Sequence, residues 1–528
     1  MRLRLDKRYL HFPVKNGAQT RRVAVQIEGG PTREFDIELA EEGEPDWWAV
    51  MDVSAFRGKM TTIRASLLNT HADALQRITN DDELKEAELL YREPHRPQFH
   101  FSPRRGWTND PNGLMYYDGE YHLFFQHNPY GRKWGNMHWG HAISRDLLHW
   151  EELPVALYPD ELGTCFSGSG VVDFRNTAGL KKGAESTLVC IYTAAGAQFT
   201  QCIAYSNDRG RTWHKYENNP VLPHIIGGNR DPKVIWYEPE EKWVMALYLD
   251  GSDFALFESR NLKTWRRLCD VSVPGTSECP EFFEIPLDGN PENTRWVFYG
   301  GNGNYLIGRF DGHTFVPESG PHRFSWGNCF YASQTFNHIP PDDGRRIQIA
   351  WGTVENPDAQ YNQQMLFPVE LTLRTTQDGP RLFAWPVREI ERIHGQHWRW
   401  ENLTIGEGET NLAGVEAELL DISAEFENRT AEEFGLIVRG TRVAYNAAQQ
   451  ELSCGGCTAP LRPVDGRVRL RLLVDRTTVE IFANGGAVYM PVASIAPPDD
   501  RFVELFARGG ETCVASLGVW EVKSVWNR

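Results

Sequence analysis

The chain has 528 residues, too many for one ordinary hydrophobic core, so we expect two or three domains. With 41% hydrophobic and 24% charged residues, its composition is that of a folded, soluble protein. The formal net charge of −16 argues against nucleic acid as a partner, because phosphate binding needs clustered Lys and Arg, and it disfavours an anionic membrane surface.

The N-terminal sequence MRLRLDKRYLHF carries positive charge but lacks the apolar stretch of about 7–15 residues that a signal peptide needs. No apolar run in the sequence reaches the length of a transmembrane helix. The sequence as written therefore predicts a cytoplasmic protein without a membrane partner. If an export signal has been removed, the prediction becomes a secreted or periplasmic protein.

Residues 1–95 are predicted to form a small β-rich module and a connector. The runs RRVAVQIEG, REFDIELA and DWWAVMDV have the apolar alternation of short strands, whereas DDELKEAELLYR reads as a short helix or a solvated linker. Three roles stay open for this module: bracing the next domain, binding a polymer, or mediating contact between the subunits of a homo-oligomer.

The middle of the chain, residues 96–385, repeats a pattern of short apolar strands. They are YHLFFQ (121–126), STLVCIYT (186–193), KWVMALYL (242–249), RWVFYGG (295–301) and RRIQIAWG (345–352). After each of the first four comes a polar turn that ends on an aromatic residue. A period of about 50 residues with several strands per unit predicts a five-bladed β-propeller. A large sandwich would not repeat its turn chemistry, and a β-helix has a much shorter period.

A polar cluster stands at the start of the first strand of each unit. The five clusters are WTNDPNG (107–113), FSGSG (166–170), NRDP (229–232), ECPE (278–281) and NCFYA (328–332). If the first strand is the innermost of each blade, all five clusters converge on one mouth of the central channel. Three of them carry an acid in an Asp-Pro or Glu-Cys-Pro setting, which suits a strand start because proline gives up a ladder donor.

The last part of the chain changes pattern. Residues 386–397 (PVREIERIHGQH) predict a short helical linker. From residue 398 to 528, alternating runs such as VRLRLLVD, TTVEIFANGG and RFVELFARGG predict a β-sandwich. The predicted fold class is therefore all-β: a five-bladed propeller with a C-terminal β-sandwich and an additional small N-terminal β-rich module.

We expect no metal and no cofactor. The nine cysteines are an odd number and lie mostly in apolar runs, which indicates reduced, buried thiols. Cys454 and Cys457 form a lone C-x-x-C, and no second ligand pair follows at a spacing suited to zinc. His127, His138 and His141 are better explained as sugar contacts or core hydrogen bonds than as ligands.

Three acids in the polar clusters suit glycosidic bond cleavage. The reaction needs one carboxylic acid to protonate the leaving oxygen and a second group to meet the oxocarbenium-like centre. Asp110, Asp231 and Glu278 come from three different units, and, if close together, at least one would have a raised pKa. The raised pKa is expected on the acid that protonates the leaving oxygen, and the pKa of a glutamate starts higher than that of an aspartate. Each alone could be a turn or cap residue, but equivalent placement in a repeat favours function. Glu281 and Glu284 lie in the same run, and spacing alone does not select Glu278.

Aromatic and polar residues near these acids complete a sugar site in outline. The chain has 18 Trp, 18 Tyr and 27 Phe, and their flat rings suit both sheet packing and stacking on sugars. Most rings are expected in the core. The candidates for the site are Trp107, Trp134, Phe166, Asn109, Gln126, Ser167 and Arg230.

The segments WTNDPNGLMYYDGEYHLFFQHNPYGRKWGNMHWGH, FSGSGVVD, RDPKVIWY and ECPEFFEIPLDG resemble glycoside hydrolase family 32, the family of invertases, inulinases and levanases. The resemblance covers about residues 96–385, and VEIFANGG resembles the family's C-terminal module. It implies a retaining mechanism with Asp110 as nucleophile, Asp231 as transition-state stabiliser and Glu278 as acid/base. The family positions implied to line the fructose pocket are Asn109, Gln126, Trp134, Phe166, Ser167 and Arg230.

Trp107 and Trp326 are added as candidates for the wall and the entrance of the pocket. Two departures from the family pattern concern subsite details: Cys329 stands where an acid often precedes FYA, and Val369 replaces an arginine. The resemblance implies exo-release of fructose from sucrose, fructo-oligosaccharides, inulin or levan. A fructosyltransferase, a silent fructan-binding propeller and an arabinan-cleaving propeller are the alternatives.

Overall fold

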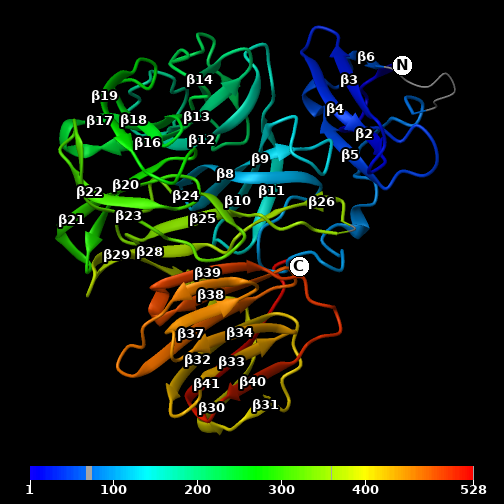
Figure 1. Ribbon diagram of the computed structural model, residues 1–528. Coiled ribbons are helices and arrows are strands. Elements are labelled where there is room, and N and C mark those ends of the chain that lie inside the picture. The colour runs from blue at the N-terminus through cyan, green and yellow to red at the C-terminus, as the bar shows by residue number, and fades with distance from the viewer. Residues whose placement is uncertain (67–73, 358, 527–528) are drawn as a thin grey trace.

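The computed structural model describes residues 1–66, 74–357 and 359–526. Three bodies of β-sheet are visible in Figure 1: a small module at the N-terminus, a large ring of sheets, and a two-sheet body that carries the C-terminus. In the described ranges the helical segments are short 3-10 turns. They are η1 (Ser54–Phe56), η2 (Ala87–Leu89), η3 (Glu238–Glu240), η4 (Arg388–Ile393) and η5 (Asn484–Gly486).

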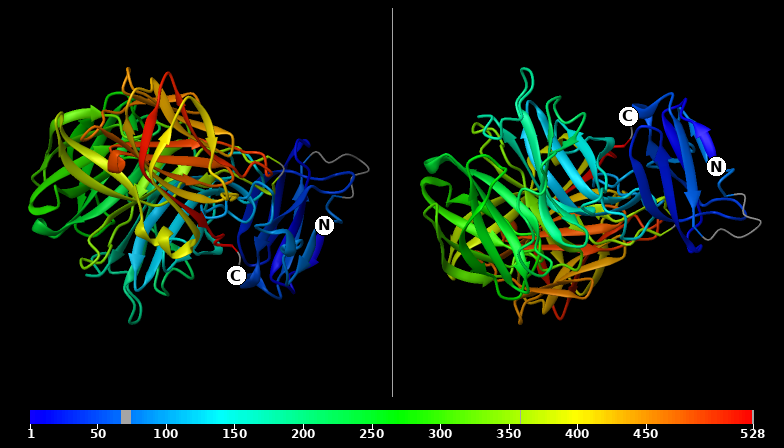
Figure 2. Two further views of the ribbon diagram at one scale, coloured as in Figure 1. Left: turned by 90° about the horizontal axis from the view of Figure 1, so that it is seen from below. Right: turned by 90° about the horizontal axis from the view of Figure 1, so that it is seen from above.

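The N-terminal module consists of two small sheets around a shared core. Its strands are β1 (Arg2–Arg4), β2 (Tyr9–Val14), β3 (Thr20–Ile27), β4 (Thr32–Glu38), β5 (Trp47–Asp52), β6 (Met60–Ala65) and β7 (Thr79–Asp81). The sheet orders are β1-β6-β3-β4 and β5-β2-β7. Alternate residues of β3, such as Val23 and Val25, meet Phe12 and Trp47 from the other sheet in one core. In both views of Figure 2 the module projects from one side of the molecule.

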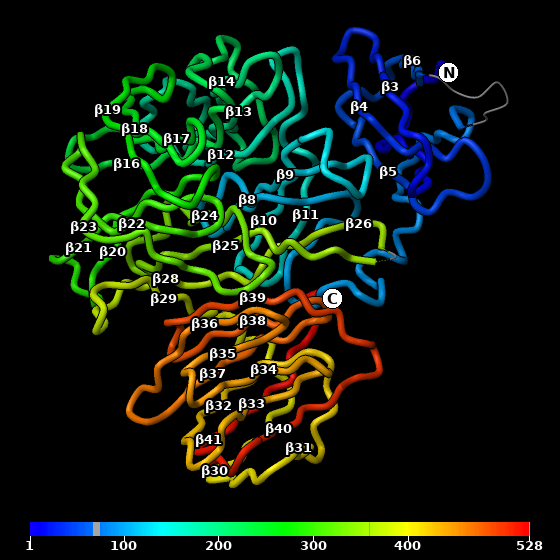
Figure 3. Tube along the Cα trace, in the orientation of Figure 1, coloured from blue at the N-terminus to red at the C-terminus, as the bar shows by residue number. Residues whose placement is uncertain are grey.

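The ring contains five antiparallel blades, which the trace in Figure 3 follows from cyan to yellow-green. Blade 1 comprises β8 (Gly106–Tyr117), β9 (Glu120–Asn128), β10 (His138–Ser144) and β11 (Trp150–Leu157). Blade 2 comprises β12 (Thr164–Asp173), β13 (Thr187–Ala195), β14 (Phe199–Ser206) and β15 (His214–Lys215). Blade 3 comprises β16 (Arg230–Tyr237), β17 (Lys242–Asp250), β18 (Asp253–Ser259) and β19 (Arg266–Ser272).

The last two blades are joined into one sheet by a single parallel pair between Leu287 and Leu373. Blade 4 comprises β20 (Glu281–Leu287), β21 (Asn290–Tyr299), β22 (Tyr305–Phe310) and β23 (Phe315–His322). Blade 5 comprises β24 (Phe330–Thr335), β25 (Arg346–Gly352), β28 (Val369–Thr376) and β29 (Gly379–Pro386), with the short β26 (Tyr361–Asn362) and β27 (Gln364–Met365) before β28. Strand β26 pairs with β8, which ties the end of the ring to its beginning.

The first strand of each blade is the innermost. Strand β8 contacts β12, β12 contacts β16, β16 contacts β20, β20 contacts β24, and β24 returns to β8. This closed ring is the arrangement that the sequence period predicts. The repeated apolar runs are the second strands, and in β9, β13 and β17 nearly every residue is buried because neighbouring blades cover both faces.

The polar turns of the repeat connect the third strand to the fourth in blades 1 to 3. In each, the indole N–H of a tryptophan donates to the backbone oxygen three residues earlier: Trp150 to Leu147, Trp213 to Gly210, and Trp265 to Leu262. In all three turns, an Asp or Asn oxygen accepts backbone N–H groups just before the tryptophan. The turn chemistry visible in the sequence is therefore one local structure used three times.

The C-terminal body has two six-stranded sheets, β30-β41-β32-β37-β38-β39 and β31-β40-β33-β34-β35-β36, around one core. The first sheet contains β30 (His394–Ile405), β32 (Leu420–Asn428), β37 (Arg467–Val474), β38 (Thr478–Ala483), β39 (Val488–Ala493) and β41 (Thr512–Val522). The second contains β31 (Gly408–Asn411), β33 (Glu433–Val438), β34 (Thr441–Asn446), β35 (Glu451–Cys454), β36 (Cys457–Pro460) and β40 (Val503–Arg508).

The segment expected to be a helical linker, residues 386–397, is only partly helical. A 3-10 turn covers Arg388–Ile393, and β30 already begins at His394. Pairing with β41 explains the early start, since the ring of His397 stacks on Trp520 at 4.4 Å. Partner-strand contacts therefore override the local helical signal.

A buried ionic network joins the propeller to the sandwich. His100, just before the first blade, lies 2.7 Å from Asp475 Oδ2 and 2.6 Å from Glu480 Oε1, and all three side chains are fully buried. Asp475 also accepts the backbone N–H groups of Gln98 and Phe99. Burial opposes the charged ring, but the two carboxylates outweigh it and raise the pKa of His100 to about 9.

We expect His100→Gln to lower the thermal unfolding midpoint strongly at pH 6, because it leaves two buried carboxylates without their cation, at about 3–5 kcal/mol. Because the folded pKa of His100 is raised, its contribution to stability is complete below about pH 6.5 and is lost as the pH rises through about 9. The unfolding midpoint of the wild type should fall across this window more than that of the variant. Calorimetry at several pH values measures both midpoints. If the midpoints of wild type and variant fall by the same amount across this window, the assignment is contradicted.

Candidate active site

The three acids meet at one mouth of the propeller. Asp110 lies in β8, Asp231 in β16, and Glu278 three residues before β20. Cys279 links two of them: its Sγ is 3.4 Å from Asp110 Oδ2 and 3.5 Å from Asp231 Oδ2, and its backbone N–H donates to Asp231 Oδ2 at 3.0 Å. Burial raises the pKa of the Cys279 thiol well above its ordinary value, so it stays protonated and can donate its single proton to either carboxylate.

Irregular backbone aims these side chains into the mouth. The β8–β9 register shifts between Thr108 and Pro111, and the β16–β17 register shifts between Arg230 and Lys233. Asp231 and Glu278 have φ of 63° and 58°, and Cys279 has 40°. A non-glycine residue in the left-handed region costs about 1–2 kcal/mol, and such strain gathers at functional sites. Bulges next to active sites redirect a side chain in the same way.

Asp110 sits in a nest of donors from the predicted pocket residues. Ser167 Oγ donates to its Oδ2, and Asn109 Nδ2 donates to its Oδ1 at 3.1 Å. The indole of Trp107 in turn donates to Asn109 Oδ1 at 2.9 Å. Burial raises the pKa of Asp110, while the bonds from Ser167 and Asn109 oppose that rise. Four predicted site residues, Trp107 included, are thus connected by hydrogen bonds.

Asp231 is the most enclosed of the three, with 6% of its surface exposed. Its backbone N–H donates to Thr193 Oγ1 at 3.0 Å, which holds the left-handed residue in place. Burial raises the pKa of its carboxyl to about 7, the nearby Arg230 guanidinium lowers it, and the charge of Asp110 raises it. A raised pKa was expected on the acid that protonates the leaving oxygen. The rises are found instead at Asp231 and Asp110, and burial is the first cause of both.

Glu278 stands at the rim, where its side chain is 33% exposed. Arg230 Nη2 lies 2.5 Å from Oε1, and the Tyr331 hydroxyl donates to Oε2 at 3.0 Å. The Arg230 guanidinium lies over the ring of Tyr248, 4.8 Å from its centroid. Burial raises the pKa of Tyr331 far above its ordinary value, so its hydroxyl remains a donor. Both oxygens of Glu278 therefore have fixed partners, and solvent still reaches the group.

The structure decides which glutamate of the ECPEFFE run faces the mouth. Glu281 is fully buried, 2.5 Å from Lys233 Nζ, and accepts a bond from Thr335 Oγ1 at 2.7 Å. Glu284 is exposed on the far part of the strand and accepts a bond from Thr294. Of the three glutamates, Glu278 is the one placed beside Arg230 and the other acids.

The aromatic candidates divide into two groups. Trp134 is 58% exposed and meets Phe166 edge-on, with ring centroids 5.8 Å apart, beside Ser167. Gln126 lies on β9, and its amide donates to Cys165 O at 3.0 Å, next to Phe166. Trp326, expected at the entrance, instead packs against the sandwich core. Its backbone N–H donates to Tyr489 O at 2.9 Å, so it is an interface residue between propeller and sandwich.

Sequence reasoning missed Cys279 and Tyr331 as site residues. Both lie inside polar clusters at the strand starts of the repeat, so their position in the sequence indicated a place near the site. Their hydrogen-bond partners could not be predicted from the sequence. Tyr331 also lines a cavity of about 300 Å³ beside Glu278, together with Gly251, Ser252, Gly275, Thr276, Ser277 and Asn302. Two lining residues bring this cavity near Glu278: Ser277 precedes it in the chain, and Tyr331 donates to it.

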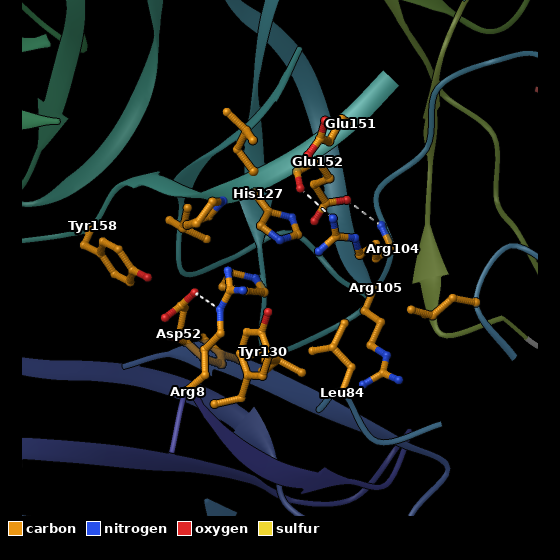
Figure 4. Close-up of a pocket in the computed structure, with 17 residues that line it drawn as sticks. Arg8, Asp52, Leu84, Arg104, Arg105, His127, Tyr130, Glu151, Glu152 and Tyr158 are labelled. Atoms are coloured by element: carbon orange, nitrogen blue, oxygen red, sulfur yellow. Dashed lines mark hydrogen bonds and ion pairs between the residues drawn. The ribbon is translucent and has the colours of Figure 1, made fainter. Parts of the chain in front are cut away.

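A second cavity of about 300 Å³ lies at the junction of the N-terminal module with blade 1, and Figure 4 shows its lining. Two of its three acids are already paired: Asp52 lies 3.0 Å from Arg8 Nε, and Glu152 accepts the backbone N–H of Arg104 at 2.8 Å. This cavity therefore does not present two free carboxylates facing each other, as glycosidic chemistry requires.

His127 and His141 make hydrogen bonds inside the propeller. His127 Nδ1 lies 2.7 Å from Trp107 O, and His141 Nε2 lies 3.0 Å from His122 Nδ1. In residues 1–66, 74–357 and 359–526, no group of three His, Cys, Asp or Glu side chains is placed to hold a metal ion. Cys454 and Cys457 face each other across a hairpin as free thiols.

Among the described residues, no helix has the length and apolarity that crossing a bilayer requires.

Comparison with known proteins places the chain in a family. Residues 100–386 match the glycosyl hydrolases family 32 N-terminal domain, and residues 389–521 match the family 32 C-terminal domain. The levanase of Bacillus subtilis is 43% identical, and the match covers 83% of this chain and 72% of that protein. The extracellular exo-inulinase of Aspergillus ficuum is 33% identical, and the match covers 83% of this chain and 96% of that protein.

Solved structures agree. The exo-inulinase of Aspergillus awamori superposes with a TM-score of 0.76 at 30% identity, covering 83% of this chain and all of that one. The β-fructofuranosidase of Schwanniomyces occidentalis gives 0.76 at 26% identity, again over 83% of this chain. The chain belongs to glycosyl hydrolases family 32 and is a glycoside hydrolase. The predicted all-β fold and the family resemblance are both confirmed.

We expect Asp231→Asn to stabilise the protein at alkaline pH. Because the folded pKa of Asp231 is raised to about 7, its contribution to stability is present below about pH 4 and is lost as the pH rises through 7. At about 1.4 kcal/mol per pKa unit, the gain in the variant has an upper limit of about 4 kcal/mol at pH 8. Thermal unfolding at pH 5 and pH 8 measures it. A midpoint difference that is the same at both values would contradict the raised pKa.

Proposed function

We propose that this protein is a retaining glycoside hydrolase that releases terminal, non-reducing β-D-fructofuranosyl residues from fructans and sucrose. The observation that carries the proposal is the cluster of Asp110, Asp231 and Glu278 at one mouth of a family 32 propeller. The names of the similar proteins, levanase and exo-inulinase, support a fructan as substrate.

In the proposed first step, an Asp110 oxygen attacks the anomeric carbon while Glu278 protonates the leaving oxygen. The bond from the anomeric carbon to that oxygen breaks as the bond to Asp110 forms, which gives a covalent fructosyl-enzyme. In the second step Glu278 takes a proton from water, whose oxygen displaces Asp110. Asn109 and Ser167 support the roles, because their donors orient the Asp110 carboxylate and favour its charged form.

Exposure supports the division of labour between the acids. Asp231 is nearly enclosed and so is suited to accept hydrogen bonds from the hydroxyl groups of a sugar ring held inside the mouth. Glu278 is at the rim, where a leaving group can depart into the cavity beside Tyr331. Arg230 and Tyr331 fix both Glu278 oxygens, and this orients the group for proton transfer. The site becomes deeper from Glu278 to Asp231. A site of this shape can hold the end of a sugar chain, which suits exo-action.

We expect Asp110→Asn to abolish turnover, because an amide cannot form the fructosyl-enzyme. Glu278→Gln should lose about 10²–10⁴-fold in kcat/KM on sucrose, which has a poor leaving group, and much less in kcat/KM on an activated aryl fructoside, because kcat/KM reports the first step alone. Initial rates on both substrates measure the effect. The buried Glu281 is unsuitable as a control, so exposed Glu284→Gln serves and should keep the wild-type rate. Equal losses of Glu278→Gln on both substrates would contradict its role as acid.

Time-resolved product analysis on sucrose, inulin and levan tests the substrate class, with Asp110→Asn as the inactive control. We expect free fructose as the first and main product, because one terminal unit is bound inside the mouth at a time. In the presence of methanol a retaining enzyme should also give methyl β-fructofuranoside. Mainly longer oligosaccharides at high sucrose would favour a fructosyltransferase. Binding without hydrolysis, or activity on arabinan alone, would reject the proposal.

We also propose that the protein acts outside the cytoplasm, where a polymeric fructan is found. The name of the similar extracellular exo-inulinase supports this location. Immunodetection in cell fractions tests it, and protein confined to the cytoplasm would contradict it.

A further inference from the structure

The N-terminal module lies before both ranges that match the family models, yet it holds a loop of the propeller. This loop, residues 129–137, connects β9 to β10. Its Tyr130 is 1% exposed and belongs to the hydrophobic core of the module rather than to that of the blade. The ring stacks on Phe35 at 3.6 Å and meets Phe12 edge-on at 6.2 Å. Tyr130 is therefore a propeller residue whose ring is buried in the core of the module.

Polar contacts add a second attachment on β4 of the module. The backbone N–H of Asp36 donates to Asn136 Oδ1 at 2.9 Å, and Asn136 Nδ2 donates back to Asp36 O at 2.7 Å. These two hydrogen bonds resemble those that a neighbouring strand would make with β4. Lys133 Nζ lies 2.7 Å from Glu38 Oε1. The loop is thus bound to the module at its beginning, its middle and its end.

The propeller holds the other side of the loop. Asn128 Oδ1 accepts the Tyr130 N–H at 3.1 Å and Asn136 Nδ2 at 3.0 Å, and Asn128 Nδ2 donates to Lys133 O at 2.8 Å. Asn362 Nδ2 donates to Arg132 O at 3.1 Å. With both sides anchored, the loop has little freedom to move.

Trp134 occupies the tip of this loop, next to Lys133. Although 58% of its surface is exposed, its ring edge is fixed against Phe166, which is followed by Ser167, the donor to Asp110. The loop therefore places an aromatic side chain at the mouth, and the module fixes the position of this side chain.

We propose that the N-terminal module is a positioning device for the substrate pocket: through Tyr130, Phe35 and Asn136 it holds Trp134 against the mouth of the site. This inference rests on the proposed function, because it takes Trp134 as a wall of the sugar pocket. Tyr130, Phe35 and Asn136 are positioning residues, since they act through Trp134 and do not touch the sugar. Among bracing, polymer binding and subunit contact, the contacts favour bracing.

The junction cavity supplies a conservative variant. Tyr130 lines this cavity, and Figure 4 shows its hydroxyl directed into it, so the hydroxyl can be removed while the ring stays on Phe35. Tyr130→Ala should raise KM for sucrose and inulin about threefold to tenfold, the range expected for a lost aromatic contact, with a smaller change in kcat. Tyr130→Phe should restore the wild-type KM. Phe315→Ala, an equally large truncation in the core of blade 4, should lower the unfolding midpoint without changing KM.

Trypsin supplies a readout that does not depend on activity. Cleavage after Lys133 should be faster in Tyr130→Ala than in wild type or Tyr130→Phe, because the loop has lost its anchor. If Tyr130→Ala does not fold, Asn136→Ala removes the second attachment with less loss of core packing, and the same increase in KM and cleavage is expected.

A double-mutant cycle decides the inference. If Tyr130 acts through Trp134, then Trp134→Ala alone raises KM, and adding Tyr130→Ala changes it no further. Effects on KM that multiply in the double variant would overturn the inference. An unchanged KM in Trp134→Ala would also overturn the inference. That result would not affect the proposed chemistry of Asp110 and Glu278, because Asp110→Asn tests the chemistry separately.

Discussion

The closed ring of five innermost strands is the constraint on which the site depends. Strands β8, β16 and β20 are separated by long stretches of chain, and only contact around the ring brings Asp110, Asp231 and Glu278 to one mouth. Closure is secured by β26, which pairs with the first strand after the chain has gone round. A propeller blade buries both faces against its neighbours, so the ring and the hydrophobic core form together.

The ring brings acids together at an energetic cost that the rest of the structure offsets. Asp231 and Glu278 adopt left-handed backbone, and burial raises the pKa of Asp231 and Asp110. Arg230 and the Cys279 thiol lie among these groups and moderate the repulsion. Strain and unfavourable burial are thus concentrated where chemistry needs poised groups, while the five blades supply the stability.

The two flanking bodies are attached by different kinds of interaction. The sandwich is joined to the propeller by a fully buried network around His100, together with apolar contacts such as those of Trp326. The N-terminal module is joined by the inserted ring of Tyr130 and by bonds to a single loop. The first attachment rests on buried charges, whereas the second reaches the loop that carries Trp134.

The sequence alone determined the strand repeat, the tryptophan turns and the clusters that hold the acids, because alternation and turn chemistry are local. It could not choose Glu278 over Glu281 by spacing, since that choice depends on which side chain meets Lys233 inside the ring. Nor could it foresee that Trp326 packs on the sandwich, that β30 starts at His394, or that Tyr130 enters another module's core. Contacts between segments distant in the chain decide these points, and no local pattern encodes them.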